Sequence, residues 1–291
     1  MAAPRVAVVI LNWRRPQDTL GCLRSLAASD YPTWEAIVVD NASGDESVPC
    51  IRAAFPQVQV LVTERNLGFA GGCNVGLRHA LAAGFPYILL LNNDVEVEPT
   101  ALGTLVAAAE AHPRAGILSP LILYADGGRV WFAGAYRRRF LPGISMPAYR
   151  RRRPIPPHPR PTDYATGCAV LLRREMLQEI GLLDESYFMY WEDWDLSERA
   201  RRSGWQVLLI PTAVVRHHVS ASTGEDAPAK WYYLGRYLPT FYRRYYRRPR
   251  FSILTYAAWV VGRELLRGNG RAVKPFWQGL REGWRSEISG R

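Results

Sequence analysis

Residues 87–94 have the sequence Tyr-Ile-Leu-Leu-Leu-Asn-Asn-Asp, an apolar run that ends in three polar residues. Runs of this kind alternate with helix-like stretches over the first hundred residues: apolar at 6–11, 36–39 and 58–62, helix-like at 16–29, 47–54 and 71–83. Strands that alternate with helices predict a parallel sheet covered by helices on both faces. This part of the chain therefore predicts an α/β fold.

Polar side chains follow directly after each apolar run: Asn12, Asp40-Asn41, Glu64-Arg65-Asn66 and Asn92-Asn93-Asp94. Ligands of open α/β sheets bind outside the carboxyl ends of the strands. We therefore expect these side chains to line a ligand site at one edge of the sheet.

Beyond residue 100 the pattern predicts further elements: helices at 100–112, 175–180 and 192–203, and strands at 115–123, 164–173, 205–210 and 213–215. Gly204 suits the C-terminal cap of the third helix. Residues 127–161 contain nine arginines, no acidic residue and a proline-rich end, which predicts an irregular loop. We expect one domain over residues 1–225 and a basic, aromatic, helical region over 226–291.

The composition is that of a globular protein with an excess of positive charge. Lys and Arg number 37 against 26 Asp and Glu, a formal charge of +11. This charge attracts anionic partners, whether nucleic acid, anionic lipid or phosphorylated substrates. The four cysteines are scattered, as expected of reduced thiols in the cytosol. We see no signal peptide, and the apolar run at 251–262 is too short to span a bilayer. We therefore expect a cytoplasmic protein, soluble or peripheral.

The polar motifs each allow two interpretations. Asp40 can accept the N3–H of a pyrimidine ring or form an Asx turn. The glycine-rich stretch 65–76 can admit a phosphate to a helix N-terminus or form a simple turn. Asp94 can bind a hard divalent cation or begin a turn.

Two more motifs lie in the second half of the chain. Residues 184–196 combine acidic and aromatic side chains, as expected of a tuned general base or of an ordinary core. His217 and His218 follow a strand and can supply an imidazole to a metal, although a lone histidine is more often structural.

In order, these pieces resemble the family 2 glycosyltransferases, and most of all the rhamnosyltransferase-like branch that builds bacterial cell-wall linkers and surface polysaccharides. The matching stretches are VVILNW, VVDNASGDES, RNLGFAGGCNVGL, LLLNNDVEVEP, TGCAVLLRR, GLLDESYFMYWEDWDLSERARRSGW and PTAVVRHHVSAS. The resemblance implies a type-A glycosyltransferase fold, a Rossmann-like nucleotide-binding sheet fused to an acceptor-binding half.

The resemblance also implies a role for individual residues. It implies donor contacts at Asn12, Asp40, Arg65, Asn66, Gly68, Gly71, Gly72, Asn92 and Asn93. Asp94 and His217 match the ligands of a divalent cation, Mn²⁺ or Mg²⁺, and Asn92 replaces the first Asp of the family's DxD motif. Asp193 matches the catalytic base, with Glu192 as a neighbour that raises its pKa by repulsion. Thr166, Gly167 and Trp191 match the acceptor side.

The implied reaction is metal-dependent transfer, with inversion, of a sugar from a nucleotide diphosphate to an acceptor hydroxyl. TDP-rhamnose is the donor we expect, with UDP-hexoses as the alternative, and a glycan or lipid-linked molecule is the acceptor. A non-catalytic sugar-nucleotide or nucleic-acid binding protein is the alternative of another class. Nucleic acid explains the charge but leaves the acidic motif without a use, so we expect no nucleic-acid partner.

The last part of the chain adds a second surface. Residues 230–250 hold seven basic and eight aromatic residues and no acidic one. Such a region favours an anionic membrane surface, on the inner face of the cell membrane, or a helix whose aromatic face packs on the catalytic domain. The sequence leaves open whether a second copy joins as a homodimer.

Overall fold

The computed structural model describes residues 3–126, 128–138, 143–151, 155–219 and 227–286. Strands and helices alternate over the first hundred residues, as the apolar pattern predicts. The elements are β1 (Val6–Asn12), α1 (Pro16–Ala27), β2 (Trp34–Asp40), α2 (Ser47–Ala54), β3 (Gln59–Val62), α3 (Gly68–Ala82), β4 (Tyr87–Asn92), β5 (Val95–Val97) and α4 (Ala101–Ala111).

The remaining elements complete the sheet and add a helical region. They are β6 (Ala115–Tyr124), β7 (Val130–Phe132), β8 (Tyr136–Arg137), β9 (Ile144–Ser145), β10 (Arg160–Pro161), β11 (Ala169–Arg173), α5 (Arg174–Ile180), α6 (Glu192–Arg202), β12 (Gln206–His217), α7 (Pro228–Tyr245), α8 (Pro249–Leu266), a short 3₁₀ helix (Gly270–Ala272) and α9 (Val273–Ser286).

The central sheet is mixed, which corrects the expectation of a parallel one. Its strand order is β10-β12-β6-β11-β4-β1-β2-β3, with β5 beside β12 and β7 beside β6. Strands β1 to β4 are parallel, but β11 enters antiparallel between β4 and β6. A short, fully buried strand such as β11 is apolar in either direction, so its sequence does not show which way it runs.

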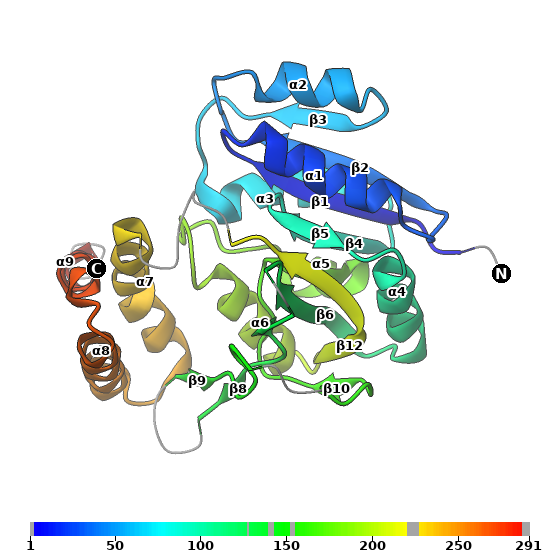
Figure 1. Cartoon of the computed structure of the whole chain (residues 1–291). Helices are drawn as coiled ribbons and strands as arrows, with labels where there is room; N and C mark the ends of the chain where they lie inside the picture. The colour runs from blue at the N-terminus through cyan, green and yellow to red at the C-terminus, as the bar shows by residue number, and fades with distance from the viewer. Residues whose placement is uncertain (1–2, 127, 139–142, 152–154, 220–226, 287–291) are drawn as a thin grey trace.

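Helices cover both faces of this sheet (Figure 1). Alternate residues of β1 face opposite layers: Val6 and Val8 pack with α1 and α4, whereas Ala7 and Val9 pack with α3, α5 and α6. Both faces are therefore apolar, which explains the continuous runs of Val, Ile and Leu. The fold is the mixed α/β arrangement of a type-A glycosyltransferase with a helical C-terminal region.

Three expectations for the second half of the chain were wrong in detail. The strand expected at 164–173 begins only at Ala169. The two strands expected at 205–215 are one strand, β12, with an irregularity between Ile210 and Val214.

The third concerns the irregular loop expected at 127–161. Its described part contains β7 to β10, and Val130 and Phe132 are buried. Apolar side chains between the arginines anchor these short strands on β6, β12 and each other. Residues 127, 139–142 and 152–154 of that segment lie outside the described residues.

The C-terminal helices lie beside the α/β layers in Figure 1 and share a core with them. Aromatic side chains of α7 and α8 pack around Tyr187 and Trp191, which precede α6. The aromatic face of this region is thus used in packing on the rest of the chain, one of the two interpretations given above. Among the described helices, none combines the length and apolarity needed to cross a bilayer.

Candidate active site

The turn between β4 and β5 brings a carboxylate against the end of β12. The Oδ1 of Asp94 lies 3.2 Å from Nε2 of His217, and both side chains are largely buried. The backbone N–H of His218 donates to the carbonyl of Asp94 at 2.9 Å, which fixes the two strand ends together. Trp131 of β7 packs edge-on to the His217 ring, with centroids 4.6 Å apart. The sequence prediction that residues 94 and 217 share a site agrees with this contact.

With His217 unprotonated, this pair fits two ligands of a divalent cation, because a metal binds the neutral imidazole and the carboxylate. Burial lowers the pKa of His217, but the neighbouring Cys168 and the hydrogen bond with Asp94 raise it to about 10. In the described part of the chain, no group of three or more His, Cys, Asp or Glu side chains could hold a metal alone. A cation here would need further oxygens, and Mg²⁺ typically takes them from substrate phosphates and water.

The second carboxylate of interest lies in the first turn of α6. Asp193 accepts the Trp194 N–H at 2.8 Å on Oδ1 and the Gly167 N–H at 3.1 Å on Oδ2. It is partly exposed, so a ligand can reach it. Burial raises its pKa to about 6, against the lowering effect of the N–H groups of Gly167 and Trp194. A carboxylate with this pKa is suited to accept a proton near neutral pH.

The neighbouring Glu192 differs from Asp193. It is 4% exposed, and its Oε2 has no hydrogen-bond partner among the described residues. Burial and then the charge of Asp193 raise the pKa of Glu192 well above its usual range. We expected Glu192 to raise the pKa of Asp193 by repulsion. The effect runs the other way, because the more buried carboxyl is the one that stays protonated.

Cys168, which the resemblance places in the acceptor-side loop with Thr166 and Gly167, is close to both of these groups. Its thiol interacts with His217 and is close enough to Asp94 and Asp193 for their charges to act on it, while burial raises its pKa. Its carbonyl accepts the N–H of Asn92 at 2.8 Å. The residues that lead into β11 thus connect Asp193, in the first turn of α6, with the turn after β4 that carries Asp94. The position of Cys168 near Asp94 and His217 depends on the antiparallel insertion of β11 between β4 and β6.

The donor-side residues at the ends of β1 and β2 form a hydrogen-bonded network. Asp40 is buried, and its Oδ1 accepts from Asn12 at 2.7 Å and from the Ser43 hydroxyl at 2.6 Å. Thr19 donates to Asn12, and Asn93 donates to Thr19 at 3.2 Å, which links this network to the turn that carries Asp94. A contact between Asp40 and a pyrimidine ring would use Oδ2, which also accepts the Ser43 N–H. This pyrimidine contact stays a prediction.

The N-terminus of α3 does not form the open phosphate site that the glycine-rich stretch suggested. The N–H groups of Leu67, Gly68 and Phe69 donate to Asn41, Asn66 and the carbonyl of Phe188. Gly68 has a φ of +75°, and a Cβ there would overlap the Phe188 carbonyl.

The other predicted residues of this stretch have different surroundings. Gly72 lets α3 approach β1, because a Cβ there would lie 2.5 Å from a methyl group of Leu11. A Cβ on Gly71 would come closest to Leu67 of the preceding turn. Arg65 is exposed just before the helix, and its predicted donor contact stays a prediction. Asn41, which was predicted to line the ligand site, joins these loops through both amide atoms.

The three predicted acceptor-side residues are placed differently. Thr166 and Gly167 adjoin Asp193, and Phe69 covers Gly167. Trp191 is 2% exposed, and its indole N–H donates to the carbonyl of Leu234 in α7 at 3.0 Å. An acceptor contact does not fit this placement. The hydrogen bond of the buried Trp191 side chain to α7 instead stabilises the left-handed turn at residues 190 and 191, where φ is 66° and 74°. Helix α6 begins from this turn.

The mixed α/β sheet, with polar and titratable side chains at the ends of its strands, is the arrangement of the type-A class of glycosyltransferases. The family model described as glycosyl transferase family 2 matches residues 7–181. The chain belongs to this family.

The relatives support the rhamnosyltransferase-like branch. The chain is 32% identical over 224 residues to the N-acetylglucosaminyl-diphospho-decaprenol L-rhamnosyltransferase of Mycobacterium tuberculosis (strain CDC 1551 / Oshkosh), over 70% of this chain and 73% of that protein. It is 29% identical to the galactofuranosyltransferase GlfT1 of the same strain, over 68% and 65% of the two chains.

Among solved structures, the mannosyltransferase PcManGT from Pyrobaculum calidifontis, in complex with GDP-Man and Mn²⁺, matches with a TM-score of 0.58. The match covers 100% of this chain and 80% of that one at 16% identity. At this identity the likeness shows the fold.

Proposed function

We propose that this enzyme transfers rhamnose from TDP-rhamnose to a hydroxyl of a lipid-linked or polysaccharide acceptor in cell-envelope glycan synthesis, with inversion at the anomeric carbon. The observation that carries the proposal is the contact between Asp94 and His217. Cys168 lies close to this pair and directly follows Gly167, whose N–H donates to Asp193. The named activity of the mycobacterial rhamnosyltransferase supports the choice of donor.

In this mechanism Asp193 takes the proton of the acceptor hydroxyl. The hydroxyl oxygen forms a bond to the anomeric carbon as the bond from that carbon to the donor's diphosphate breaks, and the nucleoside diphosphate leaves. One displacement inverts the configuration. Asp94 and His217 would hold a divalent cation, Mn²⁺ or Mg²⁺, which when bound supplies Lewis-acid stabilisation to the diphosphate. The N–H groups of Gly167 and Trp194 keep Asp193 oriented.

The test is a transfer assay with TDP-rhamnose, UDP-galactofuranose and UDP-glucose, each with Mn²⁺, Mg²⁺ or EDTA, and product NMR for the anomeric configuration. We expect transfer of rhamnose, loss with EDTA and loss in Asp94→Ala. Transfer only from a UDP-hexose would favour the alternative donor. Retained configuration would contradict the single displacement. Binding of a nucleotide sugar without transfer to any acceptor would favour a non-catalytic protein.

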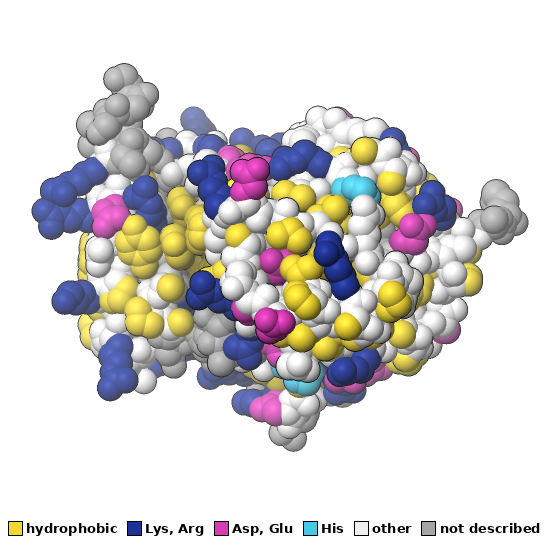
Figure 2. All heavy atoms as spheres, turned by 90° about the horizontal axis from the view of Figure 1, so that it is seen from above, with side chains coloured by type: hydrophobic (Ala, Val, Ile, Leu, Met, Phe, Trp, Pro, Cys, Tyr) yellow, Lys and Arg dark blue, Asp and Glu magenta, His cyan; other side chains and the backbone are white. Residues whose placement is uncertain are grey.

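We also propose that α8 and α9 place the enzyme on an anionic membrane surface. Large apolar side chains on these helices point to solvent, and Leu266 is 91% exposed: Phe251, Leu254, Leu265, Leu266 and Trp277. Exposed arginines flank them at both ends of α8: Arg247, Arg248, Arg250, Arg267 and Arg271. Figure 2 shows apolar and basic side chains beside one another over the C-terminal helices. Apolar side chains framed by arginines suit the interface of an anionic bilayer.

Flotation with vesicles of phosphatidylglycerol and phosphatidylcholine tests this surface. The double variant Leu254→Glu, Leu265→Glu should lower binding to anionic vesicles by roughly tenfold or more, because each charge opposes insertion. Val62→Glu, which changes an exposed apolar residue on β3, is the matched control. Equal binding by the double variant would contradict the proposal. A change in its sedimentation without lipid would instead indicate that the surface joins two copies of the chain.

A further inference from the structure

The two nitrogens of the His217 imidazole have different surroundings. Nε2 lies 3.2 Å from Oδ1 of Asp94, whereas Nδ1 is buried and has no hydrogen-bond partner among the described residues. A histidine that binds a metal usually donates its second ring N–H to a carboxylate, a carbonyl or water, and that bond fixes the orientation of the ring. The thiol of Cys168 also interacts with the ring, but sulfur is a weak hydrogen-bond acceptor. The orientation of His217 therefore depends on packing.

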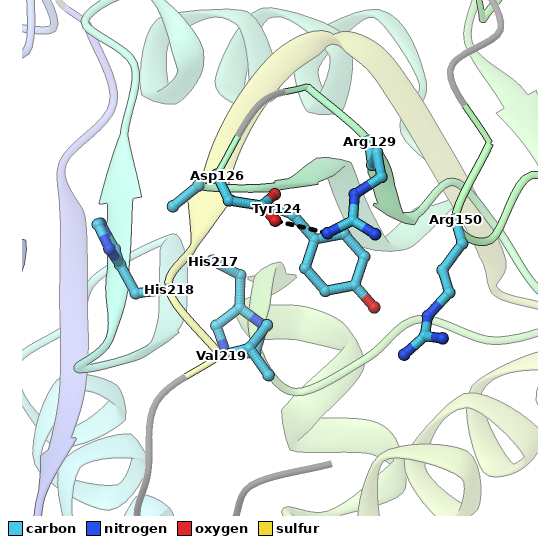
Figure 3. A pocket seen from close by; sticks show the side chains of 8 residues that line it. Tyr124, Asp126, Arg129, Arg150, His217, His218 and Val219 are labelled. Carbon is cyan, nitrogen blue, oxygen red and sulfur yellow. Dashed lines mark hydrogen bonds and ion pairs between the residues drawn. The ribbon is translucent and has the colours of Figure 1, made fainter.

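A cavity beside the ring leaves room for it to turn. This cavity of about 500 Å³ opens at the ends of β6 and β12, and its lining includes Tyr124, His217 and His218 (Figure 3). The two histidines point in different directions there, and His218 is exposed beside Glu96. A side chain that borders a cavity can reach other rotamers, which a closely packed side chain cannot. A different rotamer of His217 would take Nε2 away from Asp94.

The indole of Trp131 packs against the imidazole of His217. The two ring centroids are 4.6 Å apart, and the ring planes are at 86°. Edge-to-face contact at such a separation is an arrangement that aromatic pairs prefer. Because the indole occupies one side of the imidazole, it limits the rotation of that ring.

Trp131 is itself held in place by β7. Its neighbours Val130 and Phe132 are buried, and both pair with residues of β6. The N–H of Val130 donates to the carbonyl of Arg151 at 3.0 Å, and its carbonyl accepts the Arg150 N–H at 2.7 Å. The indole is half-buried against the core between the sheet and the helices α1 and α4. A side chain fixed in this way can fix the ring that packs against it.

We infer that Trp131 is a positioning residue, which holds the His217 imidazole with Nε2 toward Asp94 and thereby sets the affinity of the site for a divalent cation. In the proposed function, on which this inference rests, Asp94 and His217 hold that cation. Trp131 acts through the ring that it contacts. Sequence reasoning gave it no role, because β7 lies in the segment that was expected to be an irregular loop.

Binding of Mn²⁺ to the complex with TDP tests this role without requiring transfer, and the EPR signal of free Mn²⁺ measures it. Trp131→Ala should weaken Mn²⁺ binding by about tenfold or more, the usual effect of removing a group that orients a metal ligand. Trp131→Phe keeps an aromatic ring beside the imidazole and should restore most of this affinity. The affinity for TDP in EDTA should be the same in both variants and the wild type.

Trp34→Ala is the matched control for lost packing. Trp34 is half-buried against the same core, but it begins β2 at the opposite edge of the sheet from His217. This variant should bind Mn²⁺ as the wild type does, even where its Tm falls as far as that of Trp131→Ala. An equal loss of Mn²⁺ affinity in the two variants would overturn the inference. A larger loss in Cys168→Ala than in Trp131→Ala would assign the orientation of the ring to the thiol instead.

A double-mutant cycle shows whether Trp131 acts through His217. In a His217→Ala background, which keeps Asp94 and the nucleotide, Trp131→Ala should change the affinity for Mn²⁺ by less than about twofold, because the ring that it orients is gone. A further tenfold loss in that background would show that Trp131 acts by another route and would contradict the inference.

A crystal structure of metal-free Trp131→Ala separates this inference from the proposed metal role. We expect the imidazole to leave Asp94, with Nε2 beyond hydrogen-bonding distance of Oδ1 or with the ring in more than one conformer. An imidazole in the wild-type position would overturn the inference. Failure of the wild type to bind Mn²⁺ with TDP would count against the proposed metal role, whereas this structure would still decide whether Trp131 holds the ring.

Discussion

At the scale of single residues, the site depends on two adjacent carboxyls that differ in protonation. Asp193 receives two backbone N–H groups, which favour its charged form, and it is partly exposed. Glu192 is buried with one oxygen unpartnered among the described residues, which favours its neutral form. Environments that separate two neighbouring pKa values distinguish a proton acceptor from a neutral neighbour, and this difference supports the proposal that Asp193 is the acceptor.

The pH dependence of transfer tests this assignment. Because a base must be unprotonated, kcat/KM should fall as the pH drops below about 6, the pKa of Asp193. Asp193→Asn should lower kcat by about 100-fold or more, the usual contribution of a general base. Glu192→Gln keeps the neutral form of that side chain, so its acidic limb should match the wild type. A clear shift of the limb in Glu192→Gln would show that Glu192 carries a charge.

The protonation of Glu192 should make the free energy of unfolding depend on pH. Its pKa in the folded state lies above the ordinary value of 4.5, so its contribution to stability is fullest below that value and is lost as the pH rises through the folded pKa. Glu192→Gln removes this titration. Urea unfolding at pH 5 and pH 8 should show a smaller loss of stability in the variant than in the wild type. Equal losses would contradict the buried, neutral state of Glu192.

Part of the site could be predicted from residues alone. The pairing of Asp94 with His217 follows from motifs at two strand ends, and the two side chains do meet. Their role as metal ligands and that of Asp193 as the base stay predictions. The occupation of the Phe69 N–H in α3 and the burial of Trp191 could not be predicted, because the groups that accept from them, the carbonyls of Phe188 and Leu234, are distant in the chain.

At the scale of elements, α7 supports the turn that carries Asp193, and α9 supports α7. Gly279 and Gly283 of α9 lie against the backbone of α7, where a Cβ would overlap the carbonyls of Tyr232 and Arg236. Such contact between helix backbones requires residues without side chains. The sequence predicted helices here from composition, but this close approach depends on how the helices cross.

Gly279→Val should therefore separate α9 from α7 and loosen the contact of Leu234 with Trp191. We expect a loss of about 1–3 kcal/mol in stability, the usual cost of overpacking, together with a lower kcat. Urea unfolding and transfer kinetics measure the two effects. Gly262→Ala is the control, because a Cβ there meets nothing within 4 Å and alanine favours a helix. Normal kcat in a destabilised Gly279→Val would show that α9 does not support the site.

At the scale of the whole molecule, the α/β layering was predictable from periodicity, and the mixed sheet was not. An apolar run indicates burial on both faces of a sheet but not the direction of the strand, so the antiparallel insertion of β11 could not be predicted. The strand is also shorter than the predicted one at 164–173. That insertion places Cys168 and Gly167 beside Asp94 and Asp193. The segment that leads into this antiparallel strand therefore joins the turn that carries Asp94 to the first turn of α6, which carries Asp193.

A site built from both of these turns should stabilise the whole fold when it is filled. At a TDP concentration 100 times the dissociation constant, binding adds about 2.7 kcal/mol, a rise in Tm of roughly 5 °C for a chain of this size. We expect this shift only with Mn²⁺ or Mg²⁺ present, because the cation joins the diphosphate to Asp94 and His217. Asp94→Ala should lose the cation-dependent part and keep any shift due to nucleotide alone. Arg52→Ala, on the exposed side of α2, is the control. An equal shift in Asp94→Ala, measured by scanning calorimetry, would place the cation elsewhere.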